Sequence, residues 1–534
     1  MKYLFIAAAA LMSFTGFAQI DKDKVATTQK FDEVLTYVDK MYVDDIDKEE
    51  LTDAAIVALL EKLDPHSTFI SKEEVSQANV RINGNFVGIG IRFQILKDTL
   101  MVVSTIPGGP SEKLGLQAGD KIIKIENETV AGVGLKNSGV RDRLLGDRGT
   151  KVKVEVQRKN TKRPLDFVIT RDIIPVNSVD AVYMVSDKTG YIKLSAFSRN
   201  SLKEVRDGIK ALKLQGMENL IFDLQGNGGG LLRAAQYLSD EFLSDDKLIV
   251  YSEGRAQPRT DLNAGINGLF EDGKLVVLTD EYSASASEIL SGAIQDWDRG
   301  MIIGRRTFGK GLVQRPIDLT DGSQIRLTIA RYYTPSGRSV QKSYEDKEAY
   351  QKDLLDRYDR GEFFGQDSIK FDDSLMFETM INKRKVYGGG GIMPDIFVPL
   401  DTTGVSDYFS ALVRSGNVNT FALEYVDNNR EELLSKYDDF GKFRDGFNLD
   451  KGFMDEFFEY VEKESEGEED LAFNEEEYKE SEELLKLRIK ASMARDLWGY
   501  SEFYEIYNQS NEILQKAIEV IESNQYDLLG ANDQ

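Results

Sequence analysis

The chain contains no cysteine and a single histidine, His66, among its 534 residues. The absence of cysteine excludes disulfides and thiol nucleophiles, and with one histidine it also excludes zinc sites built from Cys and His. A Ser-His-Asp triad is excluded unless His66 belongs to it. A hydrolytic site in this chain must therefore draw its nucleophile and its base from Ser, Thr, Lys and carboxylates.

Basic residues are also scarce: 67 Lys and Arg stand against 91 Asp and Glu, a formal net charge of −24. Nonspecific nucleic-acid binding needs a basic surface, so we expect no nucleic-acid partner. The acidity is concentrated in residues 401–534, which hold 33 acidic and 13 basic residues, so the first 400 residues are nearly neutral. With 41% apolar residues, a chain of this length is expected to form several domains rather than one core.

Long apolar runs are lacking except near the N-terminus. Residues 1–18 place Lys2 before an apolar stretch and end in small residues at Ala18, the layout of a secretory signal peptide cleaved after Ala18. An uncleaved membrane anchor is the alternative, for which the apolar run is short. After cleavage we expect no stable membrane span, and export across the inner membrane predicts a periplasmic protein. No cysteine follows the leader, so lipoprotein anchoring is excluded.

Residue spacing divides the mature chain into four regions. Residues 19–80 show helical spacing, 81–175 alternate in short β-like runs, and 176–400 alternate strands with helices, which predicts an α/β sheet layered with helices. Residues 401–534 form an acidic helical region. This last region is interpreted either as a solvated acidic face or linker, or as helices that contact the N-terminal helices or a partner, as a homo-oligomer or adaptor surface.

The first candidate for chemistry is Ser285, in a Ser-Ala-Ser-Ala-Ser run between a predicted strand over 275–278 and a predicted helix over 284–297. The free N–H groups at a helix N-terminus can hold a developing oxyanion. Ordinary helix capping by Ser285 with Glu288 explains the same pattern.

The second candidate is Lys310, which stands between two glycines, with no carboxylate from 301 to 317. A lysine amine acts as a base only when neutral, and its ordinary pKa is about 10.4. Apolar neighbours and the nearby Arg305 and Arg306 would favour the neutral form. A solvated turn lysine is the alternative.

The third candidate is the glycine-rich stretch 225–230, between a predicted strand and helix. It matches no phosphate loop, because it lacks both G-x-G-x-x-G and a following Gly-Lys-Ser/Thr. Its glycines can still present backbone N–H groups to an oxyanion. All three candidates lie at strand ends of one α/β region, where ligand sites gather.

Together these segments resemble the carboxy-terminal processing peptidases, also called tail-specific proteases, which are PDZ-containing serine endopeptidases with a Ser–Lys dyad. The resemblance covers residues 30–400 and also rests on Leu63–Ser67 and Tyr332–Arg338. It implies a nucleophile at Ser285, a general base at Lys310, a positioning residue at Gln314, and oxyanion donors at the N–H groups of Ala286 and of a glycine among Gly228–Gly230, preferably Gly229. It implies supporting roles for Glu288, Asp296 and Thr307, a structural role for His66, and neither a cofactor nor a metal.

The resemblance also implies the fold: a multidomain α/β and β protein with a crotonase-like α/β protease core, an inserted PDZ domain, an N-terminal helical segment and a C-terminal acidic helical extension. In the PDZ segment the loop that captures a peptide carboxylate falls on Gly88, Ile89, Gly90 and Ile91. A PDZ-like plug that binds no peptide is the alternative reading of this segment.

The implied function is serine endopeptidase hydrolysis of exported proteins or peptides that end in unstructured, apolar C-termini. A non-catalytic PDZ peptide-binding scaffold is the alternative, and an acyl-CoA enzyme on the related sheet architecture is a third. The chain departs from the family pattern at Gln225, where arginine is usual, at Gly228, where proline is usual, and at Leu145, where arginine is usual.

Overall fold

The computed structural model describes residues 22–528 except residues 160, 245, 266, 371, 466–467 and 524. The predicted signal peptide lies outside the described residues. The chain forms two compact units: one contains the described residues up to Ser71 together with Pro316–Leu327, and the other contains Lys72–Arg315 and the described residues from Thr328 onward. Among the described helices, none combines the length and the apolar character needed to cross a membrane.

The first unit contains two N-terminal helices, as the helical spacing of this segment predicted, and a short strand that the spacing did not predict. The elements are α1 (Lys22–Met41), α2 (Lys48–Glu61) and β1 (Thr68–Ile70). The Asp64 carboxylate accepts the N–H of His66 and the N–H of Ser67, each at 2.8 Å, so His66 lies in the turn that follows α2. The strand β1 pairs antiparallel with the first residues of β18 (Gln324–Tyr333).

The centre of the second unit is a six-stranded sheet in the order β10-β11-β12-β15-β16-β21. The strands β11 to β21 are parallel to their neighbours, and β10 is antiparallel to β11. Three helices follow β11, β12 and β15 in sequence, as expected for parallel strands joined by crossovers. The elements are β10 (Val179–Met184), β11 (Thr189–Leu194), α6 (Ser201–Leu214), β12 (Asn219–Asp223), α7 (Leu232–Asp240), β15 (Leu275–Thr279), α8 (Ala286–Asp296), β16 (Met301–Gly304) and β21 (Ile396–Phe397).

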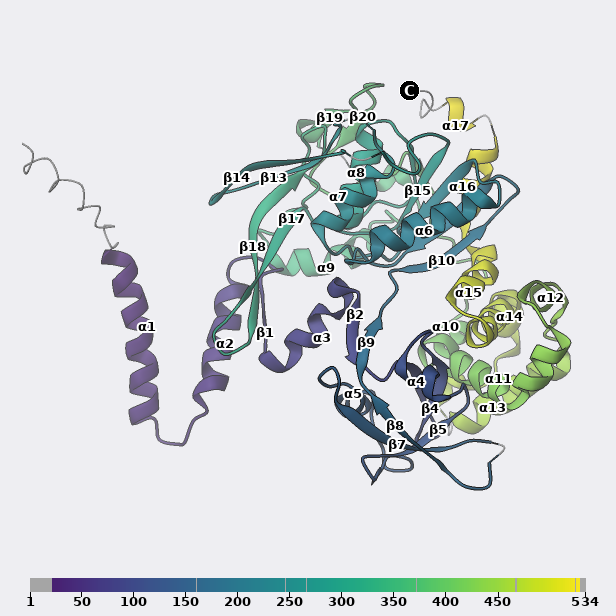
Figure 1. Ribbon diagram of the computed structural model, residues 1–534. Coiled ribbons are helices and arrows are strands. Elements are labelled where there is room, and N and C mark those ends of the chain that lie inside the picture. The colour runs from purple at the N-terminus through teal and green to yellow at the C-terminus, as the bar shows by residue number, and fades with distance from the viewer. Residues whose placement is uncertain are drawn as a thin grey trace, which may run out of the picture. The chain divides into compact units, whose positions relative to one another are not determined.

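Helices cover both faces of this sheet (Figure 1). Residues that alternate along each strand pack on opposite sides: Phe222 packs with α6, α7 and α8, while its neighbour Ile221 packs with α16 (Glu512–Glu522). The second layer thus comes from the end of the chain. The predicted layered α/β architecture is confirmed, and α16 shows that the acidic C-terminal region also supplies part of the packing of the core sheet.

The remaining elements of the core include strands of a second sheet, separate from the six-stranded sheet. The strand β18 pairs with β13 at Tyr333 and Tyr251, and β13 pairs with β14. The elements are β13 (Leu248–Gly254), β14 (Gln257–Asn263), β17 (Leu312–Asp318), α9 (Lys347–Asp359), η1 (Gln366–Ser368), η2 (Asp373–Leu375), β19 (Met376–Glu378) and β20 (Lys385–Tyr387).

The predicted β-rich segment forms a separate sheet with its own apolar core. The order is β3-β4-β5-β7-β8, so β3 lies at an edge, and β2 pairs with β9. The elements are α3 (Lys72–Asn83), β2 (Asn85–Gly88), β3 (Ile91–Leu96), β4 (Thr99–Thr105), α4 (Pro110–Leu114), β5 (Lys121–Ile125), β6 (Glu128–Thr129), α5 (Asn137–Leu144), β7 (Lys151–Gln157), β8 (Leu165–Thr170) and β9 (Asp172–Pro175).

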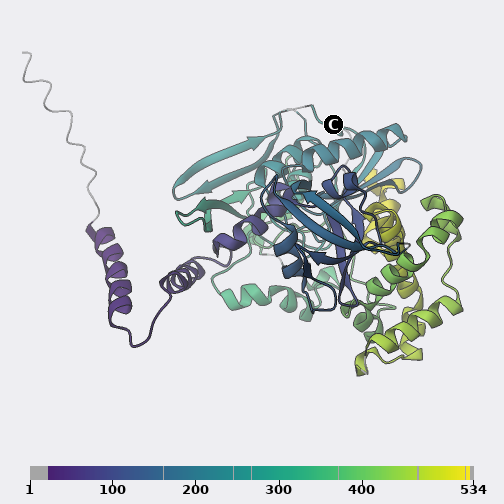
Figure 2. The same cartoon turned by 60° about the horizontal axis from the view of Figure 1, so that its bottom comes forward.

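The C-terminal region is helical, as predicted (Figure 2). Its core is rich in aromatic residues. Leu423 of this region packs with Leu96, Met101 and Val103 of the β-rich segment, so the acidic region contacts that segment through an apolar patch. The elements are α10 (Asp407–Arg414), α11 (Asn417–Lys436), α12 (Phe440–Gly446), α13 (Lys451–Glu464), η3 (Glu469–Leu471), α14 (Glu475–Leu497), α15 (Tyr500–Tyr507), η4 (Asn508–Ser510), α16 and α17 (Gln525–Leu528).

Candidate active site

Ser285 lies at the junction between β15 and α8, in a backbone conformation that is unusual for serine. Its φ is +57° and its ψ is −110°. The capping box of Ser285 with Glu288 is present, but a serine that only caps a helix takes extended dihedrals, so capping alone does not explain this geometry. A non-glycine residue held in such a region costs about 1–3 kcal/mol, and residues of this kind cluster at functional sites. The strain therefore distinguishes Ser285 from an ordinary cap.

The Glu288 carboxylate joins the serine turn to the lysine loop. One oxygen, Oε2, accepts the N–H of Ser285 and the N–H of Lys310, both at 2.8 Å. The other oxygen, Oε1, accepts the Thr307 hydroxyl at 2.6 Å and the Gly309 N–H at 2.7 Å. Glu288 is completely buried. Burial raises the pKa of its carboxyl group, and the four hydrogen bonds oppose that shift.

A hydrogen bond joins the side chains of Lys310 and Gln314. Lys310 Nζ donates to Gln314 Oε1 at 3.1 Å, and both side chains are half-buried. The Tyr332 hydroxyl lies 3.0 Å from the Ser285 carbonyl oxygen and 2.5 Å from the Lys310 carbonyl oxygen. Burial raises the pKa of Tyr332, which keeps its hydroxyl a neutral donor. The backbones of the predicted nucleophile and base are therefore linked twice, through Glu288 and through Tyr332.

Residues 224–230, called the glycine turn from here on, lie against the serine turn. A Cβ atom on Gly229 would lie 2.8 Å from Ser285 Cβ and 2.9 Å from the Ala286 nitrogen, and the φ of Gly229 is +100°. Only glycine allows this approach. Within the described residues, the Ala286 N–H has no hydrogen-bond acceptor, so it is available to an oxyanion.

The predicted second donor, the N–H of Gly229, is occupied: it donates to Asn227 Oδ1 at 2.9 Å. The N–H of the preceding Gly228 has no acceptor among the residues that the structure describes. Which glycine N–H is free to donate therefore depends on the position of the Asn227 side chain. This side chain also donates to the Leu194 carbonyl oxygen at 2.8 Å.

Three residues that hold these turns were not singled out for a role from the sequence. The Asp280 carboxylate accepts the N–H groups of Gly226 and Ser283, and the Asn227 carbonyl accepts the N–H of Ala284 at 3.0 Å. Tyr332 is the third. An asparagine between two glycines is a known turn signal, which would have found Asn227, whereas Asp280 has no glycine beside it. No local signal marks Tyr332, whose partners lie 22 and 47 residues away.

Replacing Gly229 by alanine is expected to lower kcat/KM for peptide hydrolysis by about 10²-fold, the loss typical for one misplaced oxyanion donor. The new methyl group would collide with Ser285 and Ala286. Gly228→Ala is the matched control, because its Cβ would meet no atom within 4 Å and its φ is not positive. Steady-state kinetics on both variants check this. Equal losses in the two variants would contradict a specific role for the Gly229 approach.

The predicted carboxylate loop of the β-rich segment has free donors. The Ile89 carbonyl accepts the N–H of Ser111 at 3.1 Å and its hydroxyl at 2.6 Å. Within the described part of the chain, the N–H groups of Ile89 and Gly90 have no acceptor. Gly90 has a φ of +76°, and β3 begins at Ile91. Two free N–H groups beside an edge strand are the arrangement that captures the C-terminus of an added peptide strand.

A resident metal site finds no support among the described residues, which contain no group of three or more His, Asp or Glu side chains arranged to hold a metal ion. With no cysteine and one histidine in the chain, the ligands that zinc prefers are also missing.

Comparisons with known proteins divide the chain into three matched segments. Residues 188–347 match peptidase family S41, residues 87–168 match the PDZ domain, and residues 408–499 match a family of unknown function, DUF8443.

Among curated proteins, a carboxy-terminal-processing protease of Bartonella bacilliformis is 36% identical over 317 residues, which cover 58% of this chain and 72% of the relative. The carboxy-terminal processing protease CtpA of Bacillus subtilis is 33% identical over 343 residues, which cover 63% of this chain and 72% of the relative. Among solved structures, the photosystem II D1 C-terminal processing protease is 26% identical, with a TM-score of 0.36 over 69% of this chain and 86% of that chain.

Proposed function

The chain belongs to the carboxy-terminal processing proteases of peptidase family S41 and is a serine-type peptidase with a PDZ domain, and we propose that Ser285 and Lys310 form its catalytic dyad. The observation that supports this assignment best is the Glu288 carboxylate, which accepts the N–H groups of both residues on one oxygen. Family membership confirms the predicted enzyme class. It leaves no support for the alternatives of a non-catalytic scaffold or an acyl-CoA enzyme.

The proposed reaction is acyl transfer through a covalent intermediate. Neutral Lys310 Nζ takes the proton of Ser285 Oγ, and the oxygen attacks the peptide carbonyl. Gln314 Oε1 accepts a hydrogen bond from Lys310 Nζ and so orients the amine. Lys310 then gives its proton to the leaving amine, takes a proton from the incoming water, and returns it to Ser285 as the acyl group leaves.

The proposed oxyanion hole consists of the N–H groups of Ala286 and Gly229. The N–H of Ala286 has no acceptor among the described residues, whereas that of Gly229 must leave Asn227 Oδ1. If this bond persists with substrate bound, the N–H of Gly228 is the remaining candidate. A fixed pair of such donors is commonly the largest single contribution to catalysis of acyl transfer.

The proposed substrates are exported proteins with unstructured, apolar C-termini, and the proposed location is the periplasm. The location rests on residues 1–18 alone, whose sequence has the layout of a signal peptide. Association through the terminal helices, with a second copy or with an adaptor, remains a prediction.

A peptide with a free C-terminal carboxylate is expected to bind the full chain at least about tenfold more tightly than the same peptide with an amidated C-terminus. The charge-assisted hydrogen bonds from the Ile89 and Gly90 N–H groups would be lost with the carboxylate. Fluorescence anisotropy of a labelled apolar peptide measures both affinities. Equal affinities would favour the interpretation of this domain as a plug that captures no C-terminus.

The dyad assignment is tested by covalent labelling of the purified mature chain with a fluorophosphonate. We expect one adduct, located on Ser285 by mass spectrometry, and parallel loss of cleavage of an unfolded protein with an apolar C-terminal tail. Because the chain has no cysteine, thiol adducts cannot confuse the result. An adduct on another serine, or full cleavage by labelled enzyme, would show that the nucleophile was assigned wrongly.

A further inference from the structure

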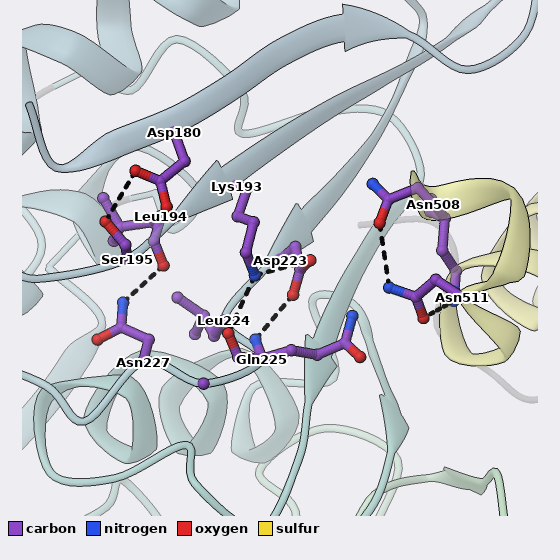
Figure 3. Close-up of polar contacts among 12 residues, drawn as sticks. Asp180, Lys193, Leu194, Ser195, Asp223, Leu224, Gln225, Asn227, Asn508 and Asn511 are labelled. Carbon is purple, nitrogen blue, oxygen red and sulfur yellow. Dashed lines mark hydrogen bonds and ion pairs between the residues drawn. The ribbon is translucent and has the colours of Figure 1, made fainter. Parts of the chain in front are cut away.

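A buried ion pair lies directly behind the glycine turn. Lys193, next to the last residue of β11, pairs with Asp223 at the end of β12, and their side chains are only 10% and 1% exposed. Lys193 Nζ lies 3.2 Å from Asp223 Oδ2 and donates to the Gln225 carbonyl at 3.0 Å. Figure 3 shows the lysine reaching between Asp223 and Gln225.

Lys193 and Asp223 together bind the backbone N–H and the backbone carbonyl of Gln225, in the glycine turn. The Gln225 N–H donates to Asp223 Oδ1 at 2.7 Å, while its carbonyl accepts from Lys193. The hydroxyl of Tyr191 donates to Asp223 Oδ2 at 2.5 Å. Gln225 lies in the glycine turn three residues before Gly228 and four before Gly229, the proposed oxyanion donors.

The C-terminal region completes the surroundings of Lys193. The ring of Tyr504, in α15, lies with its centroid 5.3 Å from Lys193 Nζ, a cation–π contact. Asn508, in η4, donates to the Tyr183 hydroxyl at 2.7 Å, and the Tyr183 ring lies 4.9 Å from that of Tyr191. The segment that supplies Tyr504 and Asn508 follows directly after residues 408–499, the part matched to a family of unknown function.

The buried charge of Lys193 depends on these neighbours. Asp180, on β10, is a second carboxylate near the amine: burial raises its pKa and Lys193 opposes that shift. A buried lysine is tolerated only when its charge is paired and its donors are used. With two carboxylates, one carbonyl and one aromatic ring around it, Lys193 is held in a single position.

We propose that Lys193 is a positioning residue for the glycine turn, and that α15 and η4 of the C-terminal region hold Lys193 in its place. The proposal rests on the proposed function, because it gives the glycine turn the task of stabilising the oxyanion. It assigns the C-terminal region a role in catalysis at a distance: by contacting Lys193, Tyr504 helps to keep the start of the glycine turn in the position from which its N–H groups can reach an oxyanion.

The first test replaces Lys193 by methionine, which keeps most of the length of the side chain and removes its charge and donors. We expect kcat for a peptide substrate to fall about tenfold or more, with KM and the affinity of the PDZ domain for a C-terminal peptide unchanged. The affinity for a peptide boronate, which mimics the tetrahedral intermediate, should fall by the same factor as kcat/KM.

Lys188→Met is the matched control. Lys188 lies just before the opposite end of β11 and pairs with Glu218 just before β12, but both side chains are more than 60% exposed. Removing this exposed pair should leave kcat unchanged. An equal loss in both variants would mean that any change to these strands lowers activity, and would overturn the positioning role.

The second test compares two variants of Tyr504, one that removes only the hydroxyl and one that removes the aromatic ring. Neither variant changes Lys193 or Asp223. Tyr504→Phe keeps the ring over Lys193 and is expected to retain wild-type kcat, while Tyr504→Leu is expected to lower kcat several-fold with unchanged KM. If Lys193→Met fails to fold, the two Tyr504 variants test the positioning role by themselves. If both Tyr504 variants keep wild-type kcat and boronate affinity, the C-terminal region has no such role.

Failure of the proposed function and failure of the positioning role of Lys193 give different experimental results. If wild-type enzyme gives no fluorophosphonate adduct on Ser285, the proposed function fails, and the role of Lys193 fails with it. If the wild-type adduct forms and cleavage depends on Ser285, yet Lys193→Met retains wild-type kcat, only the positioning role is wrong.

Discussion

Replacing Lys310 by cysteine is expected to lower kcat for peptide hydrolysis by at least about 10³-fold, close to the loss in Ser285→Ala, because no other base lies in the dyad. Lys310 Nζ is the group proposed to take the Ser285 proton, and Gln314 orients it. The fold should survive, because the Lys310 N–H bond to Glu288 is made by the backbone and does not need the amine. Steady-state kinetics and thermal melting measure both effects.

The absence of cysteine makes this variant reversible by chemistry. Alkylating the new thiol with bromoethylamine rebuilds an amine of nearly the same length, and the reagent has no other thiol to modify in the chain. We expect part of the lost kcat to return. Lys310→Arg should stay inactive, since a guanidinium does not deprotonate in proteins. Activity in the arginine variant, or no recovery after alkylation, would contradict the role of Lys310 as the base.

Replacing Glu288 by alanine is expected to destabilise the protein by about 3–5 kcal/mol and to lower kcat by about 10²-fold or more. Four donors would lose their acceptor inside the core: three backbone N–H groups and the Thr307 hydroxyl. The strained conformation of Ser285 would lose its main support, because the Ser285 N–H bond to Glu288 holds it. Chemical denaturation measures stability, and kinetics at a temperature where the variant is folded measure kcat.

Glu204 provides the matched control for Glu288. Its carboxylate also accepts several donors, the N–H and hydroxyl of Ser178 and the N–H of Val179, at 2.7–3.0 Å, but it touches neither Ser285 nor Lys310. Glu204→Ala should therefore lower stability while folded enzyme keeps kcat. The idea that Glu288 couples the two catalytic turns is wrong if the two variants lose stability equally and Glu288→Ala keeps wild-type kcat.

The elements that carry the site were predictable because each has a local pattern. The strand expected over 275–278 is β15, which extends one residue further, to Thr279. The helix expected over 284–297 is α8, which begins one residue after Ser285. Such periodicity reflects which face of a helix or strand is buried, and residues a few positions apart in the sequence are enough to show it.

Other features of the site had no such local pattern. Glu288 looked like half of a capping box with Ser285, and only the folded chain brings the lysine loop, 22 residues later, onto the same carboxylate. The glycine turn was recognised, but the bond from the Gly229 N–H to Asn227 depends on the conformation of the turn, which the sequence leaves open.

The sequence by itself narrowed the class of chemistry: without cysteine and with one histidine, it left Ser, Thr, Lys and carboxylates, and the family resemblance of its motifs indicated Ser285 and Lys310. Tertiary structure alone decided that α16, from the acidic end of the chain, covers one face of the core sheet, and that Tyr504 lies over Lys193, 311 positions away in sequence. The physical reason is that helices and strands are specified by residues a few positions apart, whereas contacts between distant segments exist only when both partners have already found their places in a common core.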